Sequence, residues 1–385
     1  MIPYGRQEIT DRDIEAIVKV LRSDFVTQGP KVPEFEQALN QYCGSDYAVA
    51  VNSATSALHI ACLALGLGRG DWLWTSPNTF VASANCALYC GAKVDFVDID
   101  PQTYNLSVEQ LTRKLQWAKK NNCLPKIVIP VHYAGHPCDM EPIYALSEEY
   151  HFQIIEDASH AIGSSYKTHM TGSCQYSHIT VFSFHPVKII TTGEGGAALT
   201  NDESLARKMR QLRSHGITNE KSLFEERSDV EIWNYQQVDL GWNYRMSDIS
   251  ASLGTSQLSR LTNYVDARIE IAETYNNELK GLPLQLPTIQ PDVKSSLHLY
   301  PVRVNNIDNP KTQLTVYEGL RQHGIASNLH YIPVHRQPFY ERMGFSSGDF
   351  PIAEQFHLQA ISLPIFPGLS KKEQERVIEV LGNLV

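Results

Sequence analysis

The 385-residue sequence has few of the features that mark secreted, membrane or nucleic-acid-binding proteins. Its first residues, MIPYGRQEITDRD, lack the basic stretch and apolar run of a signal peptide, and no window reaches about 18 uninterrupted apolar residues. Its 33 basic residues are outnumbered by 42 acidic ones, whereas nucleic acids and anionic membranes attract basic surfaces. We therefore expect a cytoplasmic protein that binds neither nucleic acid nor a membrane.

Several common site motifs are also missing. The seven cysteines contain no C-x-x-C pair and fall partly inside apolar helical patterns, so we expect them to be reduced and mostly buried. No G-x-x-x-x-G-K-[ST] string occurs, and the glycines of Gly66–Gly70 follow a helix pattern instead of joining a strand to a helix. His132 and His136 are four residues apart, but Gly135 and Pro137 disfavour a helix there. These observations exclude the usual nucleotide fingerprints and predict no metal site.

What the sequence does contain is an alternation of strands and helices over its first 200 residues. Short β-prone runs are expected at 48–52, 72–75, 94–97, 126–131, 152–157, 179–184 and 197–200. Helical patterns are expected at 54–65, 80–90, after residue 107, at 141–150 and at 202–213. Strands separated by helices favour an α/β fold with a mostly parallel sheet and helices on both faces.

The pattern changes in the second half. An irregular polar stretch covers 216–237, a helical zone covers 247–280, and a proline-rich connector follows. The last hundred residues alternate between strand-like runs at 298–304 and 325–331 and helical patterns at 311–323 and 371–384. We expect a large α/β domain over residues 1–255 and a smaller α+β domain over residues 256–385.

Polar residues follow three of the predicted strands, and ligands of parallel sheets gather at such strand ends. Ser53 and Thr55 begin a helix, where free N–H groups can hold a phosphate, although a plain helix cap fits the same residues. Glu156 and Asp157 end an apolar strand on opposite faces, so they do not form a carboxylate pair, and Asp157 could also cap a helix. Lys188 lies among apolar residues and before a glycine-rich turn, where desolvation would make its amine nucleophilic.

One ligand accounts for all three places together. Pyridoxal phosphate (PLP) needs a lysine for its aldehyde, an acid for its pyridine nitrogen, and amides and hydroxyls for its phosphate. Most lysines are simply solvated, and each place alone is weak evidence. The three places follow one another along the chain as phosphate-binding helix start, acid and lysine. This order makes a PLP enzyme the favoured interpretation.

Longer strings then carry a specific resemblance. VNSATSALHIA, TSPNTFVASAN, IIEDASHAIGSSY, FSFHPVKIITTGEGG, LRSHGI and GWNYRMSDISASLGTSQL resemble the DegT/DnrJ/EryC1/StrS nucleotide-sugar aminotransferases, which have the fold-type I PLP-dependent aminotransferase fold. TQGPKVPEFE, HYIPVHRQPFY and ISLPIFPGLS resemble the branch that aminates C4 of a UDP-linked 4-keto-6-deoxy-N-acetyl sugar on the route to pseudaminic acid. The resemblance runs almost from end to end.

The resemblance implies roles for individual residues. It makes Lys188 the residue that binds PLP covalently and later carries the proton between substrate and cofactor, and it pairs Asp157 with the pyridine nitrogen. His160 would hydrogen-bond the ring hydroxyl, and Phe80 would lie over the ring. The implied phosphate contacts are Ala54, Thr55, Ser183 and, from the neighbouring subunit, Asn243. The implied sugar-nucleotide contacts are Tyr4, Asp24, Phe25, Val26, Thr27, Asn328, Leu329, His330 and Tyr331.

The same resemblance implies a homodimer with shared active sites and L-glutamate as the amino donor. Relatives that dehydrate sugars carry histidine where this chain has Lys188, which favours transamination. Two alternatives remain open. One is a family enzyme that acts on a C3 ketone or a dTDP sugar, since one scaffold hosts many activities. The other is a non-catalytic PLP-binding regulator, which the lack of an appended basic DNA-binding module disfavours.

Overall fold

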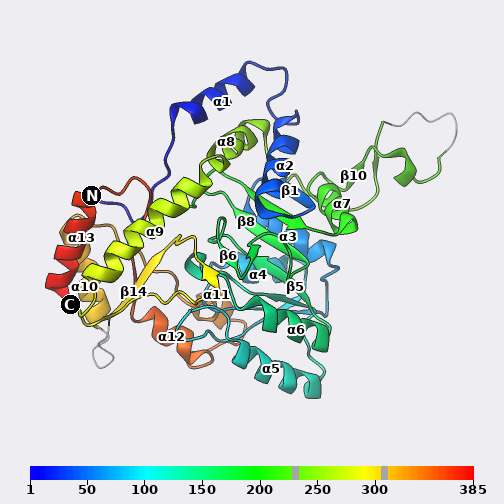
Figure 1. The fold of residues 1–385 in the computed structure, drawn as a ribbon. Coiled ribbons are helices and arrows are strands. Elements are labelled where there is room, and N and C mark those ends of the chain that lie inside the picture. Colours follow the sequence, from blue (N-terminus) through cyan, green and yellow to red (C-terminus); the bar gives the residue numbers. More distant parts are fainter. Residues whose placement is uncertain (228–233, 305–310) are drawn as a thin grey trace.

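A seven-stranded sheet forms the centre of the molecule (Figure 1). The computed structural model describes residues 1–227, 234–304 and 311–385. The strands lie in the order β1, β9, β8, β5, β4, β2, β3, and β9 alone runs antiparallel to its neighbours. Their bounds are β1 Tyr47–Val51, β2 Trp72–Thr75, β3 Lys93–Phe96, β4 Ile127–Ile129, β5 Gln153–Asp157, β8 Ile179–Ser183 and β9 Gly196–Thr200. This mixed, mostly parallel sheet confirms the expected fold class.

Helices cover both faces of this sheet because successive side chains of each strand point to opposite faces. Val49 and Val51 pack with one set of helices, whereas Ala48 and Ala50 pack with another. The first set is α3 Ala54–Ala64, α4 Ala82–Tyr89 and α7 Glu203–Leu212. The second set is α2 Lys31–Cys43, α5 Val108–Asn121, α6 Met140–Tyr150 and α8 Asp248–Leu258. The first helix, α1 (Asp11–Leu21), packs along α8, where Gln257 donates a hydrogen bond of 2.9 Å to Asp13. Asp13 also forms an ion pair with Arg260, which precedes α9.

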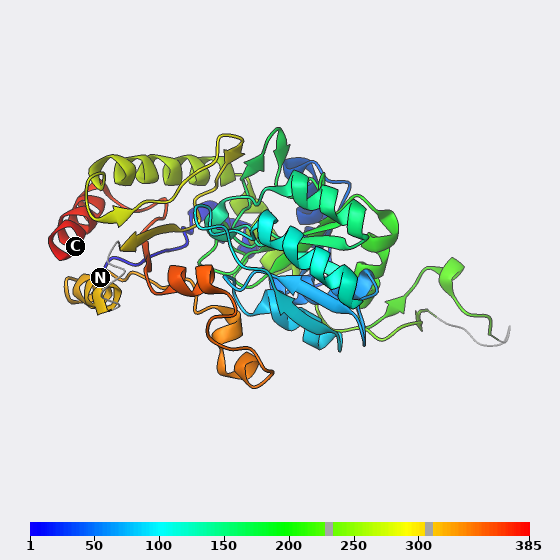
Figure 2. The same ribbon diagram turned by 90° about the horizontal axis from the view of Figure 1, so that it is seen from below.

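A smaller layer is built from the carboxyl-terminal residues. Its antiparallel sheet has the order β12, β14, β15, and these strands cover Leu284–Gln285, Tyr300–Val304 and Ala360–Leu363. Helices α9 (Leu261–Glu278), α10 (Lys311–Gln322) and α13 (Lys371–Leu384) surround this sheet and share its apolar core. Figure 2 shows this layer beside the large sheet, with the two chain termini close together.

The remaining elements are short. Helices α11 (Pro338–Glu341) and α12 (Pro351–His357) pack against the core of the large sheet. The minor strands are β6 Ser165–Tyr166, β7 His169–Met170, β10 Ile217–Thr218, β11 Gln236–Gln237 and β13 Val293–Lys294. The 3₁₀ turns are Tyr133–Gly135, Lys221–Leu223 and Val334–Arg336. Strands β10 and β11 project from the body of the molecule (Figures 1 and 2). No helix in the described part of the chain is long and apolar enough to cross a membrane.

Most expected elements are present, with two differences. The helical zone at 247–280 is two helices, because α8 ends at Leu258 and α9 begins at Leu261. The expected domain boundary at residue 255 falls inside α8. The strand expected at 325–331 is wrong: this segment forms only isolated bridges, in which Ile325 pairs with Ile2 and Asn328 with Ser362. Within the segment, His330 bonds to the side chain of Ser362 in β15. Residues 228–233 of the irregular stretch lie outside the described residues.

Candidate active site

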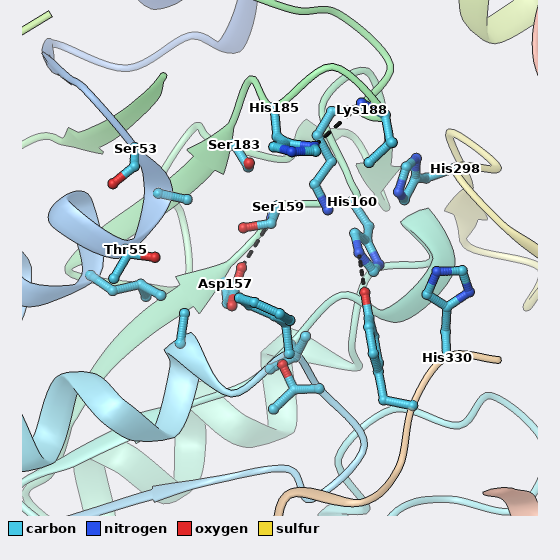
Figure 3. A pocket seen from close by; sticks show the side chains of 18 of the residues that line it. Ser53, Thr55, Asp157, Ser159, His160, Ser183, His185, Lys188, His298 and His330 are labelled. Atoms are coloured by element: carbon cyan, nitrogen blue, oxygen red, sulfur yellow. Dashed lines mark hydrogen bonds between the residues drawn. The ribbon is translucent and has the colours of Figure 1, made fainter. Parts of the chain in front are cut away.

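A cavity of about 510 Å³ lies where the carboxyl ends of β5 and β8 meet the amino end of α3. Figure 3 shows Asp157, Lys188, His160, His298 and His330 around a common space. The large sheet supplies one wall, and the segment 328–331 supplies the opposite wall. Parallel sheets place their ligands at this edge, so the topology itself selects the location.

Asp157 is the last residue of β5, and its side chain is buried at the cavity. One carboxylate oxygen, Oδ2, accepts a hydrogen bond of 2.6 Å from Ser83 Oγ of α4. The other, Oδ1, accepts one of 3.1 Å from the backbone N–H of Ser159. The preceding Glu156 points to the opposite face, where it pairs with His132 at 2.7 Å. Asp157 is therefore a buried carboxylate in a fixed orientation, whereas Glu194, which also lines the cavity, is exposed.

Lys188 enters the cavity from the turn after β8. Its backbone N–H donates a hydrogen bond of 2.8 Å to the carbonyl of His185, which closes that turn. Burial lowers the pKa of Lys188 to about 8, although the negative charge of Asp157 opposes the shift. Its amine is consequently far more often neutral, and so nucleophilic, than that of a solvated lysine.

The amino end of α3 offers unpaired backbone N–H groups at the other side of the cavity. Ser53 caps the helix by accepting a hydrogen bond of 3.1 Å from the N–H of Ser56. The first N–H groups of a helix have no partner within it and attract anions. Gly196 of β9 allows this close approach, because a Cβ atom there would lie 2.5 Å from the nitrogen of Ala54. A phosphate group is the kind of ligand that fits this cradle.

Histidine and tyrosine rings form the opposite wall. His160 accepts a hydrogen bond of 3.3 Å at Nδ1 from the N–H of Ala134, and its Nε2 lies 3.1 Å from the hydroxyl of Tyr331. Since Nδ1 accepts, the proton of the neutral ring is on Nε2. Burial lowers the pKa of His160 well below its usual value, and that of His330 to about 3. Both rings are therefore neutral near pH 7.

The structure brings most of the predicted site residues together. Those that line this cavity are Tyr4, Ala54, Thr55, Phe80, Asp157, His160, Ser183, Lys188, Asn328, Leu329, His330 and Tyr331. The others do not line it: Asn243 is exposed and forms an isolated bridge with Ser214, and Asp24, Phe25, Val26 and Thr27 form an exposed segment after α1. Asn243 is held in place by its backbone, whose carbonyl accepts a hydrogen bond of 3.3 Å from Asn52.

Two further residues were missed by sequence reasoning. Ser83 binds Asp157 from α4, and the small residues of TSPNTFVASAN are its only sequence signal. His298 lines the cavity beside Lys188, but it precedes β14 by two positions and is distant in sequence from the other site residues. No local pattern around His298 indicates a site.

Comparisons with known proteins agree with this geometry. Residues 7–382 match the model of the DegT/DnrJ/EryC1/StrS aminotransferase family. A Campylobacter jejuni relative, the UDP-4-amino-4,6-dideoxy-N-acetyl-beta-L-altrosamine transaminase, is 36% identical over 389 residues, which are 100% of this chain and 98% of the relative.

Two solved structures are similar over the whole chain. One is Spr1654 of Streptococcus pneumoniae, described as a sugar aminotransferase and solved in its pyridoxamine-phosphate (PMP) form. Its TM-score is 0.91 at 30% sequence identity, and the similarity covers 99% of its chain. Helicobacter pylori PseC, an aminotransferase involved in pseudaminic acid biosynthesis, has a TM-score of 0.89 at 30% identity and is covered to 98%. Both comparisons include 100% of this chain.

Proposed function

This chain belongs to the DegT/DnrJ/EryC1/StrS aminotransferase family, and from that premise we propose a specific reaction for it. It is a PLP-dependent sugar aminotransferase. The proposed reaction moves the amino group of L-glutamate to C4 of UDP-2-acetamido-2,6-dideoxy-beta-L-arabino-hex-4-ulose, a step toward pseudaminic acid. The similarity to the Campylobacter transaminase and to PseC supports this substrate. Another nucleotide-sugar 3- or 4-aminotransferase reaction is the second candidate, because the family fold alone does not select the sugar.

The residues of the cavity fit PLP. A lysine with a lowered pKa, a buried carboxylate and a helix amino end with a glycine at its side meet around one space of suitable size. When bound, PLP supplies an electron sink for the bond that breaks at the reacting carbon. The single observation that carries the proposal is that Lys188 shares this cavity with Asp157 and the α3 cradle.

Lys188 is the proposed catalytic residue. Its amine would hold PLP through the aldehyde carbon, and as a proton carrier it would take the proton from the α-carbon of glutamate and deliver one to C4 of the sugar. A proton carrier works best when its pKa is near the working pH, and burial has brought the pKa of Lys188 to about 8. The turn closed by His185 directs this side chain into the cavity.

Asp157 is proposed to pair with the pyridine nitrogen and keep it protonated. The hydrogen bonds from Ser83 and Ser159 hold the carboxylate in one orientation. A charged group at this depth needs a positive partner, and a protonated pyridine nitrogen is such a partner. Asp157 thereby strengthens the electron demand of the bound ring.

The remaining cofactor contacts follow the walls of the cavity. Ala54, Thr55 and Ser183 are proposed to bind the phosphate with backbone N–H groups and hydroxyls. His160 is proposed to donate a hydrogen bond from Nε2 to the hydroxyl of the PLP ring. The position of its proton on Nε2 supports this role. Phe80 covers the ring from the solvent side, which its exposed position at the cavity allows.

The proposed assembly is a homodimer with shared sites. Asn243 and the segment 24–27 lie outside the cavity of their own chain and are exposed. If they contact phosphate and sugar nucleotide as proposed, they must do so from a second copy. The other proposed substrate contacts, Tyr4 and the segment 328–331, come from the same chain, where Tyr4 packs on His330 at 5.5 Å between ring centroids.

The test is a substrate panel. Purified protein with PLP and L-glutamate would be incubated with UDP- and dTDP-linked 4-keto and 3-keto sugars, while 2-oxoglutarate release and product mass are measured. We expect the UDP-linked 4-keto-6-deoxy-N-acetyl sugar to give the highest kcat/KM. A higher value for a dTDP or 3-keto sugar would assign the enzyme to another branch of the family.

A further inference from the structure

His298 lines the cavity beside Lys188 and is only 4% exposed (Figure 3). Its Nδ1 has no hydrogen-bond partner, and its ring forms no hydrogen bond to any other described residue. A buried polar atom left without a partner costs free energy, so proteins retain few of them. Because Nδ1 is closed off from solvent, Nε2 is the ring nitrogen that a ligand in the cavity can reach.

Arg268 of α9 holds the backbone that carries this imidazole. Nη1 of Arg268 donates hydrogen bonds to the carbonyl oxygens of Leu297 at 3.2 Å, His298 at 3.3 Å and Ile365 at 2.8 Å. Arg268 is buried, and no carboxylate pairs with it in the described part of the chain. On its cavity side, the His298 ring packs on His160 with 4.4 Å between ring centroids. Arg268 thus holds the backbone of His298, and His160 packs against its ring.

The charges around His298 favour an anion. Burial lowers the pKa of His298 well below its usual value, and the rings and cations of His160, Lys188, Arg268 and His330 lower it further. The ring is therefore neutral, yet it lies in the positive potential of an arginine and a lysine. The described residues that line the cavity include no arginine, and the proposed function commits the Lys188 amine to PLP. The imidazole N–H of His298 is a neutral donor that can bind an anionic group at this depth.

The chemistry of the two substrates decides which anion reaches this place. In L-glutamate, the α-carboxylate is bonded directly to the carbon whose proton Lys188 removes. In the nucleotide sugar, the diphosphate is attached at C1, across the sugar ring from the reacting C4. We propose that His298 is a donor-binding residue whose imidazole N–H binds the α-carboxylate of L-glutamate, an inference that rests on the proposed function. Arg268 is the residue that positions it.

The two halves of the reaction test this assignment separately. In the donor half, the PLP-loaded enzyme converts glutamate to 2-oxoglutarate; in the acceptor half, the PMP-loaded enzyme aminates the keto sugar. His298→Phe keeps a ring against His160 but removes the N–H donor. We expect it to raise the apparent Kd for glutamate in the donor half roughly 10- to 100-fold, the range for losing a hydrogen bond to a charged group. The acceptor half should change by less than about 3-fold.

Two matched variants and a binding measurement complete the experiment. His298→Gln and His298→Asn place an amide N–H near Nε2 or Nδ1, and one of them should restore most of the glutamate affinity. His323→Asn, at an exposed residue just after α10, should match the wild type. Calorimetry with 2-oxoglutarate and the PLP-loaded enzyme, a pair that has no amino group to transfer, should show the same loss of affinity in His298→Phe without any turnover.

The outcomes separate this inference from the proposed function. If His298→Phe leaves glutamate affinity unchanged, or weakens both halves equally, His298 does not bind the donor and the inference is overturned. If the wild-type enzyme itself does not accept glutamate, the proposed function fails first. A selective loss for the keto sugar would assign His298 to the acceptor and would also overturn the inference.

Discussion

Lys188 of the cofactor-free protein should react with PLP as an amine whose pKa is about 8. At pH 7.5 such an amine is roughly one-quarter neutral, whereas an ordinary lysine is roughly one part in a thousand neutral. Lys188 should therefore present the nucleophilic form roughly 200 times more often than a surface lysine does. The cause is burial, and Asp157 limits the effect because its negative charge favours the protonated amine.

The assay is PLP capture as a function of pH. Stripped protein would be mixed with PLP between about pH 6 and 10.5, the bond fixed with borohydride, and the modified lysine located by mass spectrometry. The same reaction with N-acetyl-lysine corrects for the ionisation of PLP itself. We expect the rate of capture at Lys188 to level off above about pH 8, and Asp157→Asn to shift the midpoint to lower pH.

Two controls fix the interpretation. Lys188→Ala should lose covalent capture, and Lys372→Ala, which removes an exposed lysine of α13, should behave as the wild type. A midpoint near pH 10 would show that Lys188 is solvated, and a pyridoxyl group still attached to the chain in Lys188→Ala would show that another lysine binds PLP. Either result would refute the reasoning.

Three further predictions concern the rest of the site. Asp157→Ala should remain a folded dimer but lose transamination roughly 100-fold or more in kcat, about 2.7 kcal/mol of barrier, and near wild-type turnover would rule out its role. Gly196→Ala places a Cβ 2.5 Å from the nitrogen that begins α3, so its Kd for PLP should rise roughly 10-fold or more, while Gly68→Ala, with open space around it, should bind normally. Mixed Lys188→Ala and Asn243→Ala subunits, each inactive alone, should regain roughly a quarter of wild-type activity after subunit exchange, because half of the dimers then carry one intact site. No recovery despite demonstrated exchange would mean that Asn243 serves its own chain.

Local sequence patterns predict the part of the site that is built from consecutive residues. The apolar strand that ends in Asp157, the helix that begins after Ser53, and the lysine among apolar neighbours each carry their own signal. These patterns place the residues at strand ends, and the parallel topology brings the strand ends to one edge. The catalytic half of the cavity therefore follows from the sequence and a rule of topology.

The opposite wall depends on packing between distant segments. Apolar residues at 325–331 predict a strand, but Asn328 and His330 bond to each other and to Ser362, and the backbone forms only isolated bridges. His298 reaches the cavity because Arg268, thirty positions earlier, binds the carbonyl of His298. The antiparallel direction of β9 is likewise set by pairing with β1 and β8, which no local pattern encodes.

The most direct measurement follows the amino group itself. The enzyme would be supplied with PLP, ¹⁵N-labelled L-glutamate and the UDP-linked 4-keto-6-deoxy-N-acetyl sugar, and the product examined by mass spectrometry and NMR. The account predicts one ¹⁵N atom bonded to C4 of the sugar, an equal amount of 2-oxoglutarate, and no transfer in Lys188→Ala. Label at another carbon, or transfer that persists in Lys188→Ala, would contradict it.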